Sequence, residues 1–276
     1  MKKITLIIKD SIIELLEIIT LIGAFVIPYR INIPEIFKDY LTEKYPTPKD
    51  FLFFVTIEKG NAAIAIVLFL IVFKRIRKVN VSILMNRENV YHDYPYLWYC
   101  FCAKILGIKK CNLVLVPIHI QFKLIINSIF DDYPINNDEY PQIDNKQDVS
   151  VIKNGAVSTA KIVNIILEDT YIIREDQIPY NLRSLPSIKI SRNNGTDCSH
   201  HFSQQFVNVI VSEICSLRDG VTINVFATTN PKHNIGIAES AFKKADRGNI
   251  SIIYVFQQKK TGDRYFEENG EKIYNS

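Results

Sequence analysis

The fold is decided by residues 222–257, TINVFATTNPKHNIGIAESAFKKADRGNISIIYVFQ. Two runs rich in β-branched and aromatic residues, 222–228 and 250–257, flank a stretch whose periodicity predicts a helix over 235–245. A strand, a crossover helix and a second strand form a parallel pair in an α/β sheet. We therefore predict an α/β fold that contains a parallel sheet.

The same alternation extends upstream and downstream of this stretch. A polar segment over 131–148, rich in Asp, Asn and Pro, predicts a surface loop or a seam between two halves of a domain. After it we predict strands at 149–152, 170–173 and 187–192, helices at 158–168 and 202–217, and a final strand-like pair around Tyr265 and Tyr274.

Residues 79–130 carry a shorter version of the same pattern. Strands are predicted at 79–85 and 112–120, with an aromatic-rich helix at 94–106 that ends at Gly107. Residues 79–276 are therefore expected to form one cytosolic α/β domain, which can be divided into two Rossmann-like halves, 79–130 and 149–276.

The first 78 residues differ from the rest because they contain two long apolar runs, 11–29 and 51–73. Each is long enough to cross about 30 Å of hydrocarbon as a helix. Lysines precede the first run and the sequence KRIRK follows the second, which predicts a transmembrane hairpin with both ends in the cytoplasm. The alternative is a helical hairpin packed on the soluble part, or an interfacial helix.

Two acidic residues, Glu14 and Glu17, interrupt the first run on one helix face. Ionisable groups within a span usually face protein or a water-filled path, which makes both residues candidates for lining a pore. The alternative is that they lie at headgroup depth beside the basic N-terminus and are simply solvated.

Charge and cysteine usage exclude several classes of protein. The chain has 276 residues, 47% of them hydrophobic, and its net charge of +4 arises entirely within residues 1–79. A neutral C-terminal part does not favour a nucleic-acid polymer as partner, because such binding needs a concentrated basic face. Five cysteines without a CxxC pair indicate buried thiols in a reducing compartment, and we expect no metal and no cofactor.

Ligands of parallel α/β sheets bind beyond the carboxyl ends of the strands, which directs attention to two loops. The first follows the strand at 187–192 and the second follows the strand at 222–228. Their hydroxyl, amide and guanidinium groups suit phosphate, ribose and base edges, although the same residue types are common in ordinary turns. The candidate ligand-binding residues are Arg192, Asn193, Asn194, Thr196, Ser199, His200, Thr228, Thr229, Asn230 and His233.

No catalytic motif is present. The sequence lacks a Walker A motif, GxGxxG, GxSxG and HExxH, and the cluster around Asp197 and His200 has no separate third member to orient a base. We therefore expect a protein without enzymatic activity. Two alternatives remain open: a membrane-anchored nucleotide- or sugar-modifying enzyme, and a non-enzymatic membrane scaffold that binds a protein partner.

Residues 222–274 resemble the closing part of the SAVED domain, a relative of the CARF sensors built from two Rossmann-like units. The resemblance lies in Phe226-Ala227, Pro231, Ala238, a strand with Tyr254 and Phe256, and Tyr265. It implies a receptor for a cyclic oligonucleotide, with the two loops above lining its pocket.

Joined to two membrane spans, such a sensor resembles an effector of bacterial CBASS-type anti-phage signalling. The resemblance implies a multi-pass protein of the inner membrane that contacts lipid, forms a homo-oligomer when the ligand binds, and disrupts the membrane.

Overall fold

The structure, a computed structural model, describes residues 10–32, 49–136, 138–142, 149–192, 201–243, 249–259 and 262–276, and only the backbone of residues 49–58. The chain forms two compact units, which are described separately. The helical unit lies within residues 1–88 and 97–111, and the sheet unit lies within residues 89–96 and 112–276.

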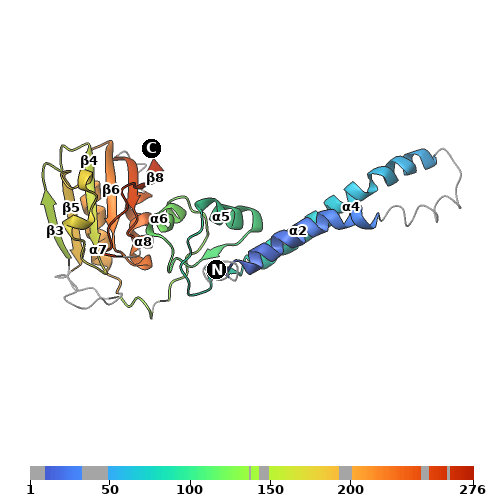
Figure 1. Ribbon diagram of the computed structural model, residues 1–276, viewed down its shortest axis with the longest axis horizontal. Coiled ribbons are helices and arrows are strands. Elements are labelled where there is room, and N and C mark those ends of the chain that lie inside the picture. Colours follow the sequence, from blue (N-terminus) through green and yellow to red (C-terminus); the bar gives the residue numbers. More distant parts are fainter. Residues whose placement is uncertain are drawn as a thin grey trace. The chain divides into compact units, whose positions relative to one another are not determined.

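The helical unit is built around two helices, α2 (Ile12–Ile31) and α4 (Lys49–Asn80), which lie side by side (Figure 1). Asn61 Nδ2 donates to Asn32 Oδ1 at 2.7 Å, just beyond the carboxyl end of α2. Asn80 Nδ2 donates to Glu17 Oε2 at 2.8 Å, near its amino end. The two helices are therefore antiparallel.

One helix, α2, is long and apolar enough to cross a membrane among the residues whose side chains are described. Large apolar side chains on it face outward: Leu16 is 55% exposed, Ile19 63% and Ile22 57%. Such a surface is favourable against hydrocarbon rather than water. The second predicted span, 51–73, lies within α4, whose first ten residues are described by their backbone alone.

The end of the helical unit confirms one predicted helix and corrects one predicted strand. The predicted helix over 94–106 is present as α5 (Tyr96–Phe101) continued by η1 (Cys102–Leu106), and Gly107 ends it with a φ of 83°. The strand predicted at 79–85 is wrong, because α4 continues to Asn80 and only β1 (Leu84–Met85) pairs with β2 (Lys110–Cys111). Short β-branched runs do not by themselves distinguish a strand from a helix end.

The strand predicted at 112–120 is also wrong. Leu115 has a φ of 58°, which makes a turn, and α6 (Ile118–Ile126) follows directly after Pro117. Proline fixes its own φ and lacks an amide donor, so it is compatible with a helix start and unfavourable inside a central strand. The apolar residues of this run therefore pack as loop and helix.

The sheet unit contains a six-stranded sheet in the order β3-β5-β4-β6-β7-β8 (Figure 1). The strands are β3 (Val149–Asn154), β4 (Ile162–Glu168), β5 (Ser187–Arg192), β6 (Val221–Ala227), β7 (Ile250–Phe256) and β8 (Glu271–Asn275). The four inner strands are parallel and the two edge strands, β3 and β8, are antiparallel to their neighbours. The predicted mixed α/β class with a parallel sheet is confirmed.

Both faces of the sheet are covered. Helices α6, α7 (Gln204–Cys215) and α8 (Pro231–Ile237), with η4 (Ala238–Phe242) continuing α8, contact one another on one side. On the other side, η2 (Glu175–Gln177) and η3 (Tyr180–Leu182) lie near a core of Ile166, Ile173, Ile178, Phe226, Phe256 and Phe266. The inner strands are consequently buried on both faces.

The helix predicted over 158–168 is wrong, because residues 162–168 form the central strand β4. A strand buried on both faces reads as a nearly continuous apolar run rather than an alternating one, which explains the error. The strand predicted at 170–173 is absent, since no residue there belongs to a strand. The predicted strands at 149–152, 187–192, 222–228 and 250–257 and the helix at 202–217 are confirmed within two residues at each end. The helix predicted to begin at Ile235 begins at Pro231.

Candidate functional site

The direction of the connections reverses at β4, which is the position where open parallel sheets bind ligands. The chain passes from β4 to β5 on one side, and then crosses to β6 on the other side of β4. Three segments therefore meet at the carboxyl ends of these strands: Asp169 after β4, Arg192 at the end of β5, and residues 228–230 after β6. This carboxyl edge is the candidate site.

The centre of the edge is a buried ion pair. Arg192 Nε lies 2.6 Å from Asp169 Oδ1, and the two side chains are 4% and 0% exposed. Asn230 donates to the second carboxylate oxygen from its backbone N at 3.1 Å and from its side-chain Nδ2 at 3.0 Å. His233 Nδ1 approaches that oxygen to 2.7 Å. The carboxylate of Asp169 is thus held by donors from β5, from the loop after β6 and from α8.

Two opposing effects set the pKa of Asp169. Burial by itself raises it, whereas the hydrogen bond from His233 and the charge of Arg192 lower it, and the pKa lies below its ordinary value. The Ser203 backbone N–H donates to His233 Nε2 at 2.8 Å, which assigns the ring proton to Nδ1 and directs it at Asp169. Asp169 is therefore an ionised carboxylate inside the fold at neutral pH.

The loop after β6 is fixed by its own side chains. Asn230 Oδ1 accepts from the backbone N–H of His233 at 2.9 Å and caps α8, with Pro231 in the first turn. Thr228 Oγ1 donates to the Tyr171 carbonyl oxygen at 2.7 Å. Thr229 donates to the Asn234 side chain. Residues 228–233 are therefore held in place by hydrogen bonds, and they form the floor of the candidate site.

The structure brings five of the predicted ligand-binding residues together at this edge: Arg192, Thr228, Thr229, Asn230 and His233. All five are buried, with exposed fractions between 0% and 8%, and their side chains are bonded within the protein. The other five lie outside the described residues: Asn193, Asn194, Thr196, Ser199 and His200. The described part of the predicted site is thus the buried group at the carboxyl edge, and the rest of the prediction falls within residues 193–200.

Sequence reasoning missed Asp169, whose carboxylate contacts three of the five: Arg192, Asn230 and His233. Its signal was present, because Glu168 and Asp169 end the apolar run IVNIILED at 162–169. A carboxylate directly after a buried parallel strand is a site candidate, but the same run was interpreted as a helix.

A second polar cluster occupies the other face of the same strand. Glu168 Oε1 lies 2.6 Å from Lys189 Nζ and accepts from the Ile173 backbone N–H at 2.7 Å. Ser191 Oγ donates to Glu168 Oε2 at 2.5 Å. The cluster ties β5 to the segment that follows β4.

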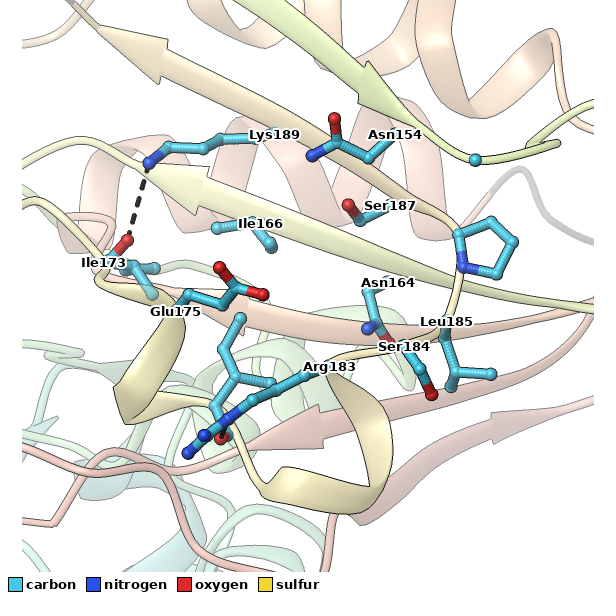
Figure 2. Close-up of a pocket in the computed structure, with 13 residues that line it drawn as sticks. Asn154, Asn164, Ile166, Ile173, Glu175, Arg183, Ser184, Leu185, Ser187 and Lys189 are labelled. Carbon is cyan, nitrogen blue, oxygen red and sulfur yellow. Dashed lines mark hydrogen bonds between the residues drawn. The ribbon is translucent and has the colours of Figure 1, made fainter.

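Beside this cluster lies a cavity of about 400 Å³, which Figure 2 shows over the face of β4 and β5. Asn154, Asn164 and Ser187 line it near the amino ends of those strands, and Glu175 and Arg183 face them from the other wall. Its cations are engaged: Lys189 contacts Glu168, and Arg183 donates to the carbonyl oxygens of Ile178 and Asp176, both at 2.7 Å. The cavity therefore suits a small neutral polar group better than a phosphate.

The two acidic residues of α2 contact protein groups in the helical unit. Glu14 is 2% exposed and its Oε1 lies 3.0 Å from a guanidinium nitrogen of Arg87. Glu17 accepts from Asn80, whose Nδ2 also donates to the Leu106 carbonyl oxygen at 2.9 Å. These contacts tie the start of α2 to residues around the end of α4. The pore-lining role of Glu14 and Glu17 stays a prediction.

Comparison with known proteins gives a family and two structural likenesses. Residues 1–274 match the model of the SMODS- and Ubiquitin system-associated 2TM effector domain. Two structures of the Acinetobacter baumannii Cap4 SAVED/CARF-domain containing receptor, with the cyclic trinucleotides 2′3′3′-cAAA and 3′3′3′-cAAA, resemble the chain at TM-scores of 0.42 and 0.39. Each is 11% identical and covers 66% of this chain, which spans 42% of theirs. No curated protein matches the chain.

Proposed function

This chain belongs to the SMODS- and Ubiquitin system-associated 2TM effector family, and we propose that it is a membrane-anchored receptor for a cyclic oligonucleotide that acts as an anti-phage effector. The sheet unit binds the ligand at its carboxyl edge. The helical unit attaches the protein to the bacterial inner membrane.

The proposal rests on one observation: three segments, at Asp169, Arg192 and residues 228–230, meet at the reversal point of a parallel sheet in a chain of an effector family. Four parallel strands direct their carboxyl ends to one edge, where the predicted residues Arg192, Asn230 and His233 meet around Asp169. Residues 193–200 follow Arg192 directly in the sequence, and from them Asn193, Asn194, Thr196, Ser199 and His200 contact the ligand in this proposal. The resemblance of residues 222–274 to SAVED domains supports a cyclic oligonucleotide as the class of ligand.

The apolar helix α2 supports membrane attachment through two spans, 11–29 and 51–73, with both termini in the cytoplasm. A ligand shifts a two-state module only through differential affinity, and moving a population from 1:99 to 99:1 takes about 5.5 kcal/mol. Assembly of several ligand-bound copies shares this demand among subunits. We infer that binding drives homo-oligomerisation, which gathers the helical units and disrupts the bilayer.

Calorimetry on the detergent-solubilised full-length chain tests the receptor function, with synthetic cyclic di-, tri- and tetra-adenylates as probes. Saturable binding of at least one probe is expected, as is dye release from liposomes that contain the protein when that probe is added. Asn194→Ala weakens binding, whereas Arg218→Ala leaves it unchanged because Arg218 donates to the Thr159 carbonyl oxygen near the amino ends of the strands.

The two alternatives give different results in the same assays. Conversion of a probe into a product identifies an enzyme. A chain that binds no probe, and releases no dye, is not a cyclic-oligonucleotide effector and fits the scaffold.

A further inference from the structure

A surface arginine stacked on a tyrosine stands at the rim of the carboxyl edge. The guanidinium carbon of Arg264 lies 4.0 Å from the centroid of the Tyr171 ring, and both residues are exposed. Tyr171 belongs to the segment after β4, and Arg264 belongs to the loop between β7 and β8. Two loops that follow parallel strands therefore meet in this pair.

The pair is connected to the floor of the candidate site. The Tyr171 carbonyl oxygen accepts from Thr228 Oγ1, and the Thr170 backbone N–H donates to the Thr228 carbonyl oxygen at 3.1 Å. Tyr171 is thus fastened to the same loop that carries Asn230 and His233. A ligand lying on that edge has Tyr171 and Arg264 at its border.

The guanidinium of Arg264 is available to a ligand. Among the described residues it makes no hydrogen bond and no ion pair, and its only contact of these kinds is with the Tyr171 ring. The other arginines described in the sheet unit all donate to a carboxylate or a carbonyl: Arg174, Arg183, Arg192 and Arg218. Among the arginines that the structure describes in this unit, Arg264 alone has a guanidinium without such a polar partner.

The backbone that presents Arg264 is anchored on both sides. The Asp263 carbonyl oxygen accepts from Gln177 Nε2 at 2.7 Å, and the Phe266 backbone N–H donates to the Gln177 carbonyl oxygen at 2.9 Å. Phe266 is 3% exposed and stacks edge-on against Phe226. Arg264 itself has a φ of 57°, in the left-handed region that residues with a Cβ rarely adopt. The loop holds this strained residue in place with its side chain outward.

We propose that Arg264, whose guanidinium lies over the Tyr171 ring, binds a phosphodiester group of the ligand at the rim of the carboxyl edge. The inference rests on the proposed function, because the ligand class comes from it. A planar guanidinium with free N–H groups recognises phosphate oxygens in pairs, and the aromatic ring keeps its plane fixed at little entropic cost. The cavity in Figure 2 does not offer this chemistry, because its cations are engaged.

The test measures the affinity of the detergent-solubilised full-length chain for the synthetic cyclic adenylate that the wild type binds most tightly. Arg264→Ala raises Kd at least tenfold, and Arg264→Lys recovers only part of the loss because ammonium lacks the planar fork. Tyr171→Ala raises Kd about threefold, whereas Tyr171→Phe keeps the ring and stays within twofold of the wild type. Arg218→Ala, which removes the same charge at the opposite edge, leaves Kd unchanged.

Three results separate the possible failures. A wild-type chain that binds no cyclic adenylate overturns the proposed function and the ligand class with it. A wild-type chain that binds while Arg264→Ala binds equally well overturns the assignment of Arg264 alone. Measurement at two salt concentrations identifies the group contacted, since a phosphate contact is screened by salt and a base contact is not. If Arg264→Ala weakens binding by the same factor at both salt concentrations, Arg264 does not contact a phosphodiester group.

Discussion

Two consecutive carboxylates at the end of β4, Glu168 and Asp169, serve two clusters on opposite faces of one sheet. Successive side chains of a strand point to opposite faces, so the pair divides between them. Asp169 and its partner Arg192 are 0% and 4% exposed, whereas Glu168 and its partner Lys189 are 7% and 28% exposed. Adjacent residues of the same charge therefore occupy surroundings with different access to water.

The clusters also differ in what they join. Asp169 receives donors from β5, from the loop after β6 and from α8, and so it connects three elements across the reversal point. Glu168 receives donors from β5 and from Ile173, which is five residues further along the chain. A buried charge that loses its partner is costly because nothing else solvates it, while a partly exposed one is rescued by water. The difference predicts a ranking of effects.

The largest effect is expected from Asp169→Ala. This variant removes the Asp169 carboxylate from the buried guanidinium of Arg192, and removing one member of a buried pair costs about 3–5 kcal/mol. Amide hydrogen exchange of the full-length chain in detergent reports the loss at β4, β5 and β6. Glu175→Ala, at an exposed carboxylate, is the control and leaves exchange there unchanged. A loss below about 1 kcal/mol for Asp169→Ala would contradict the ranking.

The second effect is a pH dependence carried by Asp169. Its pKa in the fold is lower than the ordinary value of 3.8, so its contribution to stability is fully present above that value. The contribution is lost as the pH falls through the folded pKa. The wild type therefore loses stability on acidification below about pH 4, and Asp169→Asn lacks this component. The free energy of unfolding, measured by hydrogen exchange at several pH values, tests this expectation. If the wild type and Asp169→Asn show the same pH dependence, the assignment to Asp169 is wrong.

Part of the site could be predicted from the sequence, and the part around Asp169 could not. The strands at 187–192 and 222–228 were predictable because each is a short β-branched run followed by turn residues, and these strands place Arg192 and Asn230 at one edge. Strand β4 was not, because burial on both faces removes the alternation that identifies a strand. With β4 assigned as a helix, Asp169 could not be placed beside Arg192.

The pair of Tyr171 and Arg264 at the rim of the site could not be predicted from the sequence, for a different reason. Tyr171 and Arg264 are 93 positions apart in the sequence, and no local pattern pairs an exposed tyrosine with a distant arginine. Their contact depends on Gln177, which binds the backbone at Asp263 and at Phe266. Long-range contacts of this kind follow from loop geometry, which periodicity does not encode.

The smallest effect is expected at the second cluster, from Lys189→Met. Glu168 keeps the donors of Ser191 and Ile173 in this variant, and water reaches the partly exposed site, so the expected loss is about 1 kcal/mol. Arg174→Ala breaks the pair with Asp176, whose members are 56% and 53% exposed, and is the control that leaves unfolding unchanged. Both are measured by hydrogen exchange under the conditions used for Asp169→Ala. If Lys189→Met costs as much as Asp169→Ala, access to water does not separate the two clusters, and the number of elements that each carboxylate joins has no bearing on its contribution.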